Sequence, residues 1–282
     1  MSRRAAEAIA AFEKIEKRGG SPTEGYILVC SVPIKSSSTA DAFVKGLSSS
    51  HWRVVLGCLK NVGRWAAFPD KFIPELIRLL QHRETSVQSE AAKALGAFGS
   101  EAELAVPKLV QLCPKAELLV AEQVVLSLCA IPGGESHART ILLEYLDASR
   151  RGEEWCSDYV VKPAEYEPYG RSGLNVPKIG KVCSLLSGIE VEKEDTLERV
   201  GDHFRANSWG SEENPNILRN VQTELLSVFR RLGCSGVQDD IVEFVRTYPE
   251  EARGRMARQL LYFNPDDWTE EQRERLVHSS SL

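Results

Sequence analysis

Hydrophobic residues recur along the chain at intervals of three and four positions, and this spacing predicts α-helices. An amphipathic helix is predicted within residues 1–20, with Ile9, Phe12 and Ile15 on one side. No alternation typical of strands competes with the helical spacing. Each predicted helix has one apolar stripe, which it has to bury against other helices. The pattern therefore predicts an all-α protein.

The helical pattern repeats between residues 69 and 132. The segment FIPELIRLL at 72–80 matches AVPKLVQLC at 105–113 when it is shifted by 33 positions, and the following helix recurs with it. Stacking such helical pairs buries their apolar faces in one continuous core, which is the physical basis of a solenoid. Four leucines in the stripes are expected core residues: Leu76, Leu95, Leu109 and Leu128.

An earlier unit extends the repeat towards the N-terminus, over residues 51–63. A shift of 36 positions places Gly63 under Gly99. Both glycines are predicted to end helices, because glycine adopts the left-handed C-cap conformation without strain. Pro74 and Pro107 are expected near the starts of first helices, where a missing N–H costs little.

The sequence FIPELIRLLQ, a short turn and SVQSEAAKALGAFG, within residues 69–132, resemble the HEAT-repeat family. The resemblance is weaker at 51–63 and at 217–264. HEAT repeats commonly carry an Asp in the turn and an Arg after the Val that opens the second helix, and these form a polar ladder between units. Gln88 and Ala121 stand at the arginine positions here, so the ladder is expected to be missing or rebuilt. The resemblance implies an α-solenoid with a concave protein-binding surface.

Three parts of the chain are expected. Residues 1–149 hold N-terminal helices and HEAT-like repeats, and residues 216–282 hold further repeats and a capping helix. Between the two repeat blocks, residues 150–215 are expected to form an irregular insertion with short helices. Its first part, RRGEEWCSDYVVKPAEYEPY, has no helical period and contains two prolines. In solenoids, insertions often map to the binding face.

Composition narrows the class of protein. With a net charge of −5, the chain lacks the overall positive potential that non-specific nucleic-acid binding requires. Nucleic acid is therefore an unlikely partner. The seven cysteines are scattered without a CxxC pair, as reduced thiols are. Acidic residues interrupt the N-terminal apolar run, and no apolar stretch approaches the roughly 18 residues of a membrane span. A cytoplasmic protein is therefore expected, with no membrane segment.

Catalytic and metal-binding motifs are missing from the sequence. None of the five histidines stands in an HExxH arrangement, and no GxGxxG, GxxxxGKS or GxSxG occurs. Asp202 could orient His203 as a base. Adjacent residues on a helix point in different directions, however, so a packing histidine is the preferred interpretation. No catalytic residue, metal or cofactor is predicted.

Two segments are candidate binding surfaces. The acidic aromatic loop, residues 153–169, combines five acids with four aromatic rings, which suits a steered binding hot spot or a staple onto the repeats. Its candidate contact residues are Trp155, Asp158, Tyr159, Glu165, Tyr166, Glu167 and Tyr169. The C-terminal arginine patch could hold an acidic peptide or a phosphate, or form a solvated face. It consists of Arg230, Arg231, Arg255 and Arg258.

These features favour a non-catalytic solenoid that binds another protein. If the acidic aromatic loop forms the contact, the partner is expected to have a basic surface. Size and acidity suit a stoichiometric inhibitor, for example an immunity protein that neutralises a toxin or an enzyme. Two alternatives stay open. One is a HEAT-like enzyme of the alkylpurine DNA glycosylase or bilin lyase type, and the other is an assembly or regulatory subunit of a larger complex.

Overall fold

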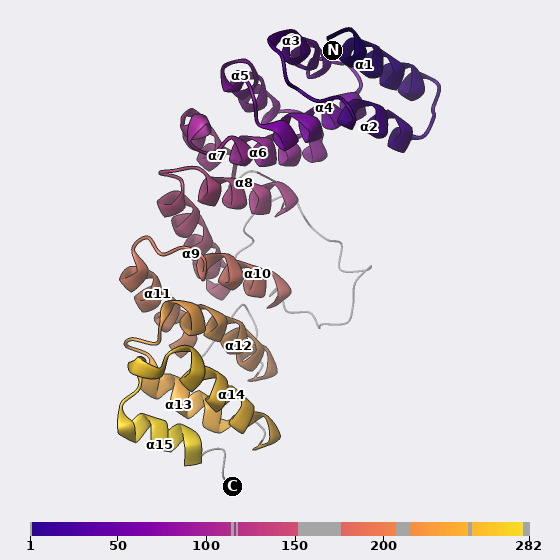
Figure 1. The fold of residues 1–282 in the computed structure, drawn as a ribbon. Helices are drawn as coiled ribbons and strands as arrows, with labels where there is room; N and C mark the ends of the chain where they lie inside the picture. Colours follow the sequence, from indigo (N-terminus) through magenta and orange to yellow (C-terminus); the bar gives the residue numbers. More distant parts are fainter. Residues whose placement is uncertain are drawn as a thin grey trace. The chain divides into compact units, whose positions relative to one another are not determined.

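The computed structural model of the chain is built from α-helices (Figure 1). It describes residues 2–113, 116, 118–151, 176–206, 215–247 and 250–278, and these ranges contain no strand. The described residues form two compact units, which divide between Ala138 and Arg139. Helical pairs stack within each unit, so the predicted all-α solenoid fold is confirmed. None of the described helices is long and apolar enough to cross a membrane.

Unit 1 alternates first and second helices of a repeat. The first helices are α1 (Ser2–Lys17), α3 (Ser37–Gly46), α5 (Pro69–Leu79) and α7 (Val106–Leu112). The second helices are α2 (Pro22–Cys30), α4 (Trp52–Trp65), α6 (Thr85–Phe98) and α8 (Leu118–Ala130). A 3₁₀ helix, η1 (Gly99–Ala105), precedes α7. The second helices pack in sequence order, α2 on α4, α4 on α6 and α6 on α8 (Figure 1).

The repeat period is 33 residues across three second helices, because α4, α6 and α8 begin at positions 52, 85 and 118. The predicted shift of 36 for residues 51–63 is therefore wrong. A displacement of three residues is close to one helical turn, so the apolar stripe of α4 matches that of α6 almost as well in the wrong register. Sequence similarity alone could not separate the two alignments.

The corrected register moves the expected helix ends. Gly99 is the C-cap of α6 with φ of 55°, as predicted, whereas Gly63 lies inside α4. The C-cap of α4 is Ala66, which has φ of 40° and lies 33 positions before Gly99. Pro74 lies inside α5 rather than near its start, and Pro69 occupies the first position instead. Pro107 stands at the start of α7, as predicted.

Close approach of the second helices explains the small residues within them. A Cβ added to Gly63 would lie 3.3 Å from Cα of Ala94, and one added to Gly96 would lie 3.0 Å from Cα of Ser127. Because the second contact sits 33 residues after the first, the same backbone approach recurs in successive repeats. A larger side chain at either glycine would separate the helices.

The expected polar ladder is rebuilt from other side chains. Asn61 donates from Nδ2 to the carbonyl oxygens of Val29 at 3.1 Å and Val32 at 2.8 Å. Ser127 stands 66 positions later, at the equivalent place, and its hydroxyl lies 2.7 Å from the carbonyl oxygens of both Ala92 on α6 and Gln123 on α8. Both side chains are buried, so each satisfies a backbone carbonyl between repeats.

The core follows the predicted stripes. Leu76, Leu95, Leu109 and Leu128 have no exposed surface, which confirms their assignment. In α1, Phe12 is fully buried and packs against Tyr26 in a T-shaped, edge-to-face arrangement with a centroid distance of 5.2 Å. Burial of these rows of side chains is the main source of stability in the stack.

Unit 2 begins within α9 (Glu135–Arg151), of which residues 139–151 belong to it. Its other helices are α10 (Val176–Leu186), α11 (Lys193–Arg205), α12 (Pro215–Leu232), α13 (Gln238–Thr247), α14 (Glu250–Phe263) and α15 (Glu270–His278). Helix α12 packs against α10, α11 and α14, and α13 packs against α14 and α15. Helices α10 and α11 therefore both pack against α12, and both fall within the predicted insertion, residues 150–215.

Helix α15 ends the described stack. Thr269 and Gln272 form a reciprocal capping box, in which each side chain accepts the backbone N–H of the other, at 3.2 and 3.1 Å respectively. Just before it, the 3₁₀ helix η3 (Pro265–Asp267) places the Asp267 carboxylate 2.6 Å from the backbone nitrogen of Cys234. This contact ties the last helix to the end of α12.

Candidate functional site

The seven candidate contact residues of the acidic aromatic loop, from Trp155 to Tyr169, lie outside the described residues. Their role as a binding surface stays a prediction.

The C-terminal arginine patch lies on two helices that pack together, α12 and α14. Arg230 of α12 donates from Nη1 to the side-chain oxygen of Gln259 of α14 at 2.9 Å. Arg231, Arg255 and Arg258 are exposed. The structure therefore brings the two arginine-bearing helices together and keeps three of the four guanidinium groups in solvent, while a ligand for them stays a prediction.

A surface that the sequence did not predict lies on α2, on α4 and on the segment between α2 and α3 in unit 1. We call it the cation–aromatic surface and define it by Tyr26, Ile27, Lys35, Lys60, Arg64 and Trp65. The Lys60 ammonium lies 4.9 Å from the ring centroid of Tyr26, and the Lys35 ammonium lies 5.8 Å from that of Trp65. Both distances are in the range of cation–π interactions.

The positive charges of α4 act electrostatically on Cys30, a residue of α2. Burial raises the pKa of the Cys30 thiol, while the positive charges of Lys60 and Arg64 act in the opposite direction, because both cations lie nearby. The negative charge of Glu90, on α6, also acts on this thiol. Lys60 and Arg64 are one turn apart on α4 and are both exposed. They form one row of positive charge beside α2.

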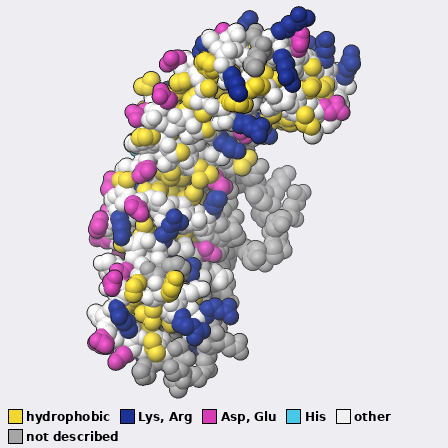
Figure 2. Space-filling model, viewed as in Figure 1, with side chains coloured by type: hydrophobic (Ala, Val, Ile, Leu, Met, Phe, Trp, Pro, Cys, Tyr) yellow, Lys and Arg dark blue, Asp and Glu magenta, His cyan; other side chains and the backbone are white. Residues whose placement is uncertain are grey.

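Apolar side chains remain exposed around these cations. Ile27 is 65% exposed and Trp65 is 38% exposed. Within the described ranges, neither Lys35, Lys60 nor Arg64 forms an ion pair with a carboxylate. Figure 2 shows Lys and Arg side chains gathered among hydrophobic ones over the N-terminal helices. Exposed apolar area next to unpaired charge is a feature of interaction surfaces.

The charge of the sequence is unevenly distributed along the chain. Residues 1–98, which end with α6, contain 14 lysines and arginines against 9 aspartates and glutamates, although the whole chain has a net charge of −5. The spacing of four between Lys60 and Arg64 could have indicated a basic helix face. Its pairing with α2 could not, because Tyr26 to Cys30 is a continuous apolar run without helical periodicity.

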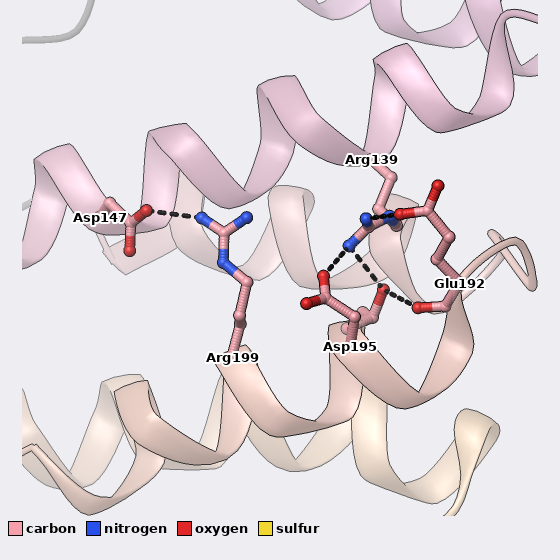
Figure 3. A network of polar contacts seen from close by, with 6 residues as sticks. Arg139, Asp147, Glu192, Asp195 and Arg199 are labelled. Atoms are coloured by element: carbon pink, nitrogen blue, oxygen red, sulfur yellow. Dashed lines mark hydrogen bonds and ion pairs between the residues drawn. The ribbon is translucent and has the colours of Figure 1, made fainter.

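A polar network links α9 to α11 in unit 2 (Figure 3). Arg139 of α9 donates from Nη1 to a carboxylate oxygen of Asp195 at 2.5 Å and also pairs with Glu192. A second ion pair joins the same two helices, because Nη2 of Arg199 on α11 donates to Asp147 on α9 at 2.7 Å. Arg139 is only 5% exposed, so its charge needs these partners. The network joins α9 to α11 rather than presenting an open site.

His203 belongs to this network as a packing histidine, which confirms the preferred interpretation. Its Nε2 lies 2.9 Å from Asp147 Oδ1, so its partner is Asp147 of α9 and not the neighbouring Asp202. Burial lowers its pKa to about 4, and the charge of Asp147 only partly opposes this effect. The ring is therefore neutral at pH 7. With 2% of its surface exposed, it is not accessible to a substrate.

The thiols of Cys58, Cys183 and Cys234, which are buried, and of Cys129, which is partly buried, are poor nucleophiles. Burial raises the pKa of Cys129 to about 11 and that of Cys234 to about 12, and it raises the pKa values of Cys58 and Cys183 as well. The reactive thiolate form is scarce near neutral pH at such values. Among the described residues, no group of three His, Cys, Asp or Glu side chains is arranged to hold a metal ion.

Comparison with known proteins identifies the repeat type. Residues 40–129 match the family model for HEAT repeats. No curated protein matches the chain. Two crystal structures of engineered proteins, both targets of the Northeast Structural Genomics Consortium, are similar to it. The first is 14% identical with a TM-score of 0.45, and the similarity covers 86% of this chain and 98% of that one. The second is 15% identical with a TM-score of 0.37, covering 82% and 88%. The matched segment covers the helical pairs from α3 to α8, whose second helices recur every 33 residues, so the family match agrees with the HEAT-repeat resemblance of the sequence.

Proposed function

We propose that the protein is a non-catalytic helical-repeat scaffold that binds another protein. The observation that carries this proposal is the cation–aromatic surface, where Ile27 and Trp65 stay exposed beside Lys60 and Arg64. Apolar anchors next to charges that form no ion pair in the described ranges suit a protein interface, because rings and aliphatic chains bury area while charges steer association. HEAT repeats commonly mediate such interactions.

We further propose that the protein acts as a stoichiometric inhibitor, such as an immunity protein that neutralises a toxin or an enzyme. The support is the acidic aromatic loop, whose five acids are complementary to a basic active site. The cytoplasm is the proposed compartment, since the six described cysteines are all free thiols.

The test uses the intact chain, tagged, as bait in a lysate of the source cells. Bound material is analysed by mass spectrometry and for nucleic acid. We expect a protein retained at near-equal molar amount, whose own activity falls in a titration that ends at one equivalent. Retention of nucleic acid or of a small molecule in place of a protein would contradict the scaffold function. A retained protein whose activity does not change would contradict the inhibitor role alone.

A further inference from the structure

We infer that the cation–aromatic surface of α2 and α4 binds an acidic segment of a partner protein, one in which carboxylates alternate with bulky apolar side chains. The inference rests on the proposed protein-binding function and specifies the surface and the chemistry of the partner.

The arrangement of cations sets the charge of the ligand. Lys60 and Arg64 form a row on α4, and Lys35 lies beside the ring of Trp65 at the end of that helix. All three are exposed, and none is paired with a carboxylate in the described ranges. Arg53, at the start of α4, is different, because Glu16 already pairs with it at 3.2 Å. The three cations are thus available to carboxylates of a partner.

The apolar groups set the second requirement. Ile27 and Leu28 are exposed on α2, and Trp65 is exposed on α4. Exposed aliphatic and aromatic area next to cations matches a segment that contributes Leu, Phe or Trp side chains between its acids. Ile27 lies three positions before Cys30 and shares a helix face with it, and the charges of Lys60 and Arg64 act on Cys30, so one ligand can contact the apolar and basic groups.

A protein segment fits this surface better than a nucleic acid. Non-specific phosphate binding uses extended rows of cations, and aliphatic side chains such as Ile27 add nothing to a phosphate contact. A peptide can place its acids at the cations and an apolar residue elsewhere.

The test measures fluorescence anisotropy of a labelled 16-residue peptide in which Glu alternates with Leu and Trp, added to the intact chain at two ionic strengths. Comparison probes are the same peptide with Lys in place of Glu, the same peptide with Ser in place of Leu and Trp, and a single-stranded oligonucleotide. We expect the acidic apolar peptide to bind tightest. The variant K60E/R64E should weaken it by about 10-fold or more and reduce its salt dependence.

Two further variants make the result specific. Ile27→Ser should lower the affinity for the peptide by about 3-fold or more at both ionic strengths, because it removes apolar contact area rather than charge. The matched control is K45E/K108E on α3 and α7, which reverses two exposed charges outside both candidate surfaces and should leave the affinity unchanged. Circular dichroism melts verify that each variant is folded.

The inference is overturned if the oligonucleotide binds tighter than the peptide, if K60E/R64E binds like wild type, or if the K45E/K108E control loses as much. The bait experiment tests the proposed scaffold function separately from this surface. A K60E/R64E bait that still retains the cellular partner contradicts this surface but leaves the scaffold function standing, whereas wild-type bait that retains no protein contradicts the scaffold function itself.

Discussion

Arg139 on α9 donates to Asp195 on α11 over 2.5 Å, although 56 positions separate the two residues in the sequence. The guanidinium is buried, whereas the carboxylates of Asp195 and Glu192 are about half exposed. The two sides of the ion pair therefore differ in what their removal leaves behind. Loss of the arginine leaves two carboxylates that water can solvate, but loss of the carboxylates leaves a buried positive charge.

This asymmetry predicts unequal mutational effects. The double variant E192Q/D195N should destabilise the protein by about 3 kcal/mol, because Arg139 then lacks a charged partner. Arg139→Met fills a similar volume without charge and should cost less, about 1 kcal/mol. Urea melts of both variants measure the difference. A larger loss for Arg139→Met would contradict the network as described.

The depressed pKa of His203 predicts a pH-dependent stability. Its pKa is about 4 in the folded protein, below the ordinary 6.5, so the unfolded chain binds more protons at this site. The contribution of His203 is complete above pH 6.5 and is lost as the pH falls towards 4, by up to about 3 kcal/mol. Arg150 and Arg199 also favour the neutral ring, and Asp147 opposes it.

Urea melts at pH values from 7 to 4 test this contribution. His203→Gln should flatten the decline of the unfolding free energy over that range. The exposed His137 provides the control, since His137→Gln should leave the decline as in wild type. An equal slope in wild type and His203→Gln would show that His203 does not titrate as its burial requires.

The left-handed C-cap of α4 predicts a stabilising substitution. Ala66 has φ of 40°, a conformation that strains any residue with a Cβ. Ala66→Gly should raise the unfolding free energy by about 1 kcal/mol, and Gly99→Ala at the equivalent cap of α6 should lower it by a similar amount. Thermal melts decide the sign. Ala97→Gly, at an exposed helical position, is the control and should destabilise.

The core leucines predict large losses of stability. Alanine at Leu76, Leu95, Leu109 or Leu128 should cost about 2 to 5 kcal/mol each in denaturant melts, because each truncation leaves a cavity in a fully buried site. The exposed Leu104 of η1 is the matched control, and Leu104→Ala should change stability by less than about 0.5 kcal/mol. Core variants that melt like this control would contradict the repeat register.

The acidic aromatic loop predicts separate effects of rings and charges on partner binding. Trp155→Ala or Tyr166→Ala should weaken binding by about 2 kcal/mol or more without lowering thermal stability. E165K/E167K should mainly slow association and change its salt dependence. On-rates and off-rates with the captured partner at two ionic strengths distinguish the two. Aromatic variants that melt early yet bind normally when folded would show that the rings are structural staples.

The sequence by itself determined the helical class, the 33-residue period after residue 69 and the buried leucines. These features depend on local spacing, since a side chain three or four positions away shares its helix face wherever the helix finally packs. The register of α4 was beyond this reasoning. Gly63 and Ala66 are three residues apart, and a shift of nearly one turn preserves the apolar stripe.

Only the tertiary structure decided which residues meet between helices. The pairing of His203 with Asp147, the bond of Ser127 to Ala92 and the meeting of Lys60 with Tyr26 all join different helices. Such contacts depend on how stacked helices are rotated and spaced relative to one another. The apolar pattern of a single helix does not specify these quantities. The cation–aromatic surface therefore arises from the packing of α2 on α4, because neither helix carries both the exposed apolar run and the row of cations.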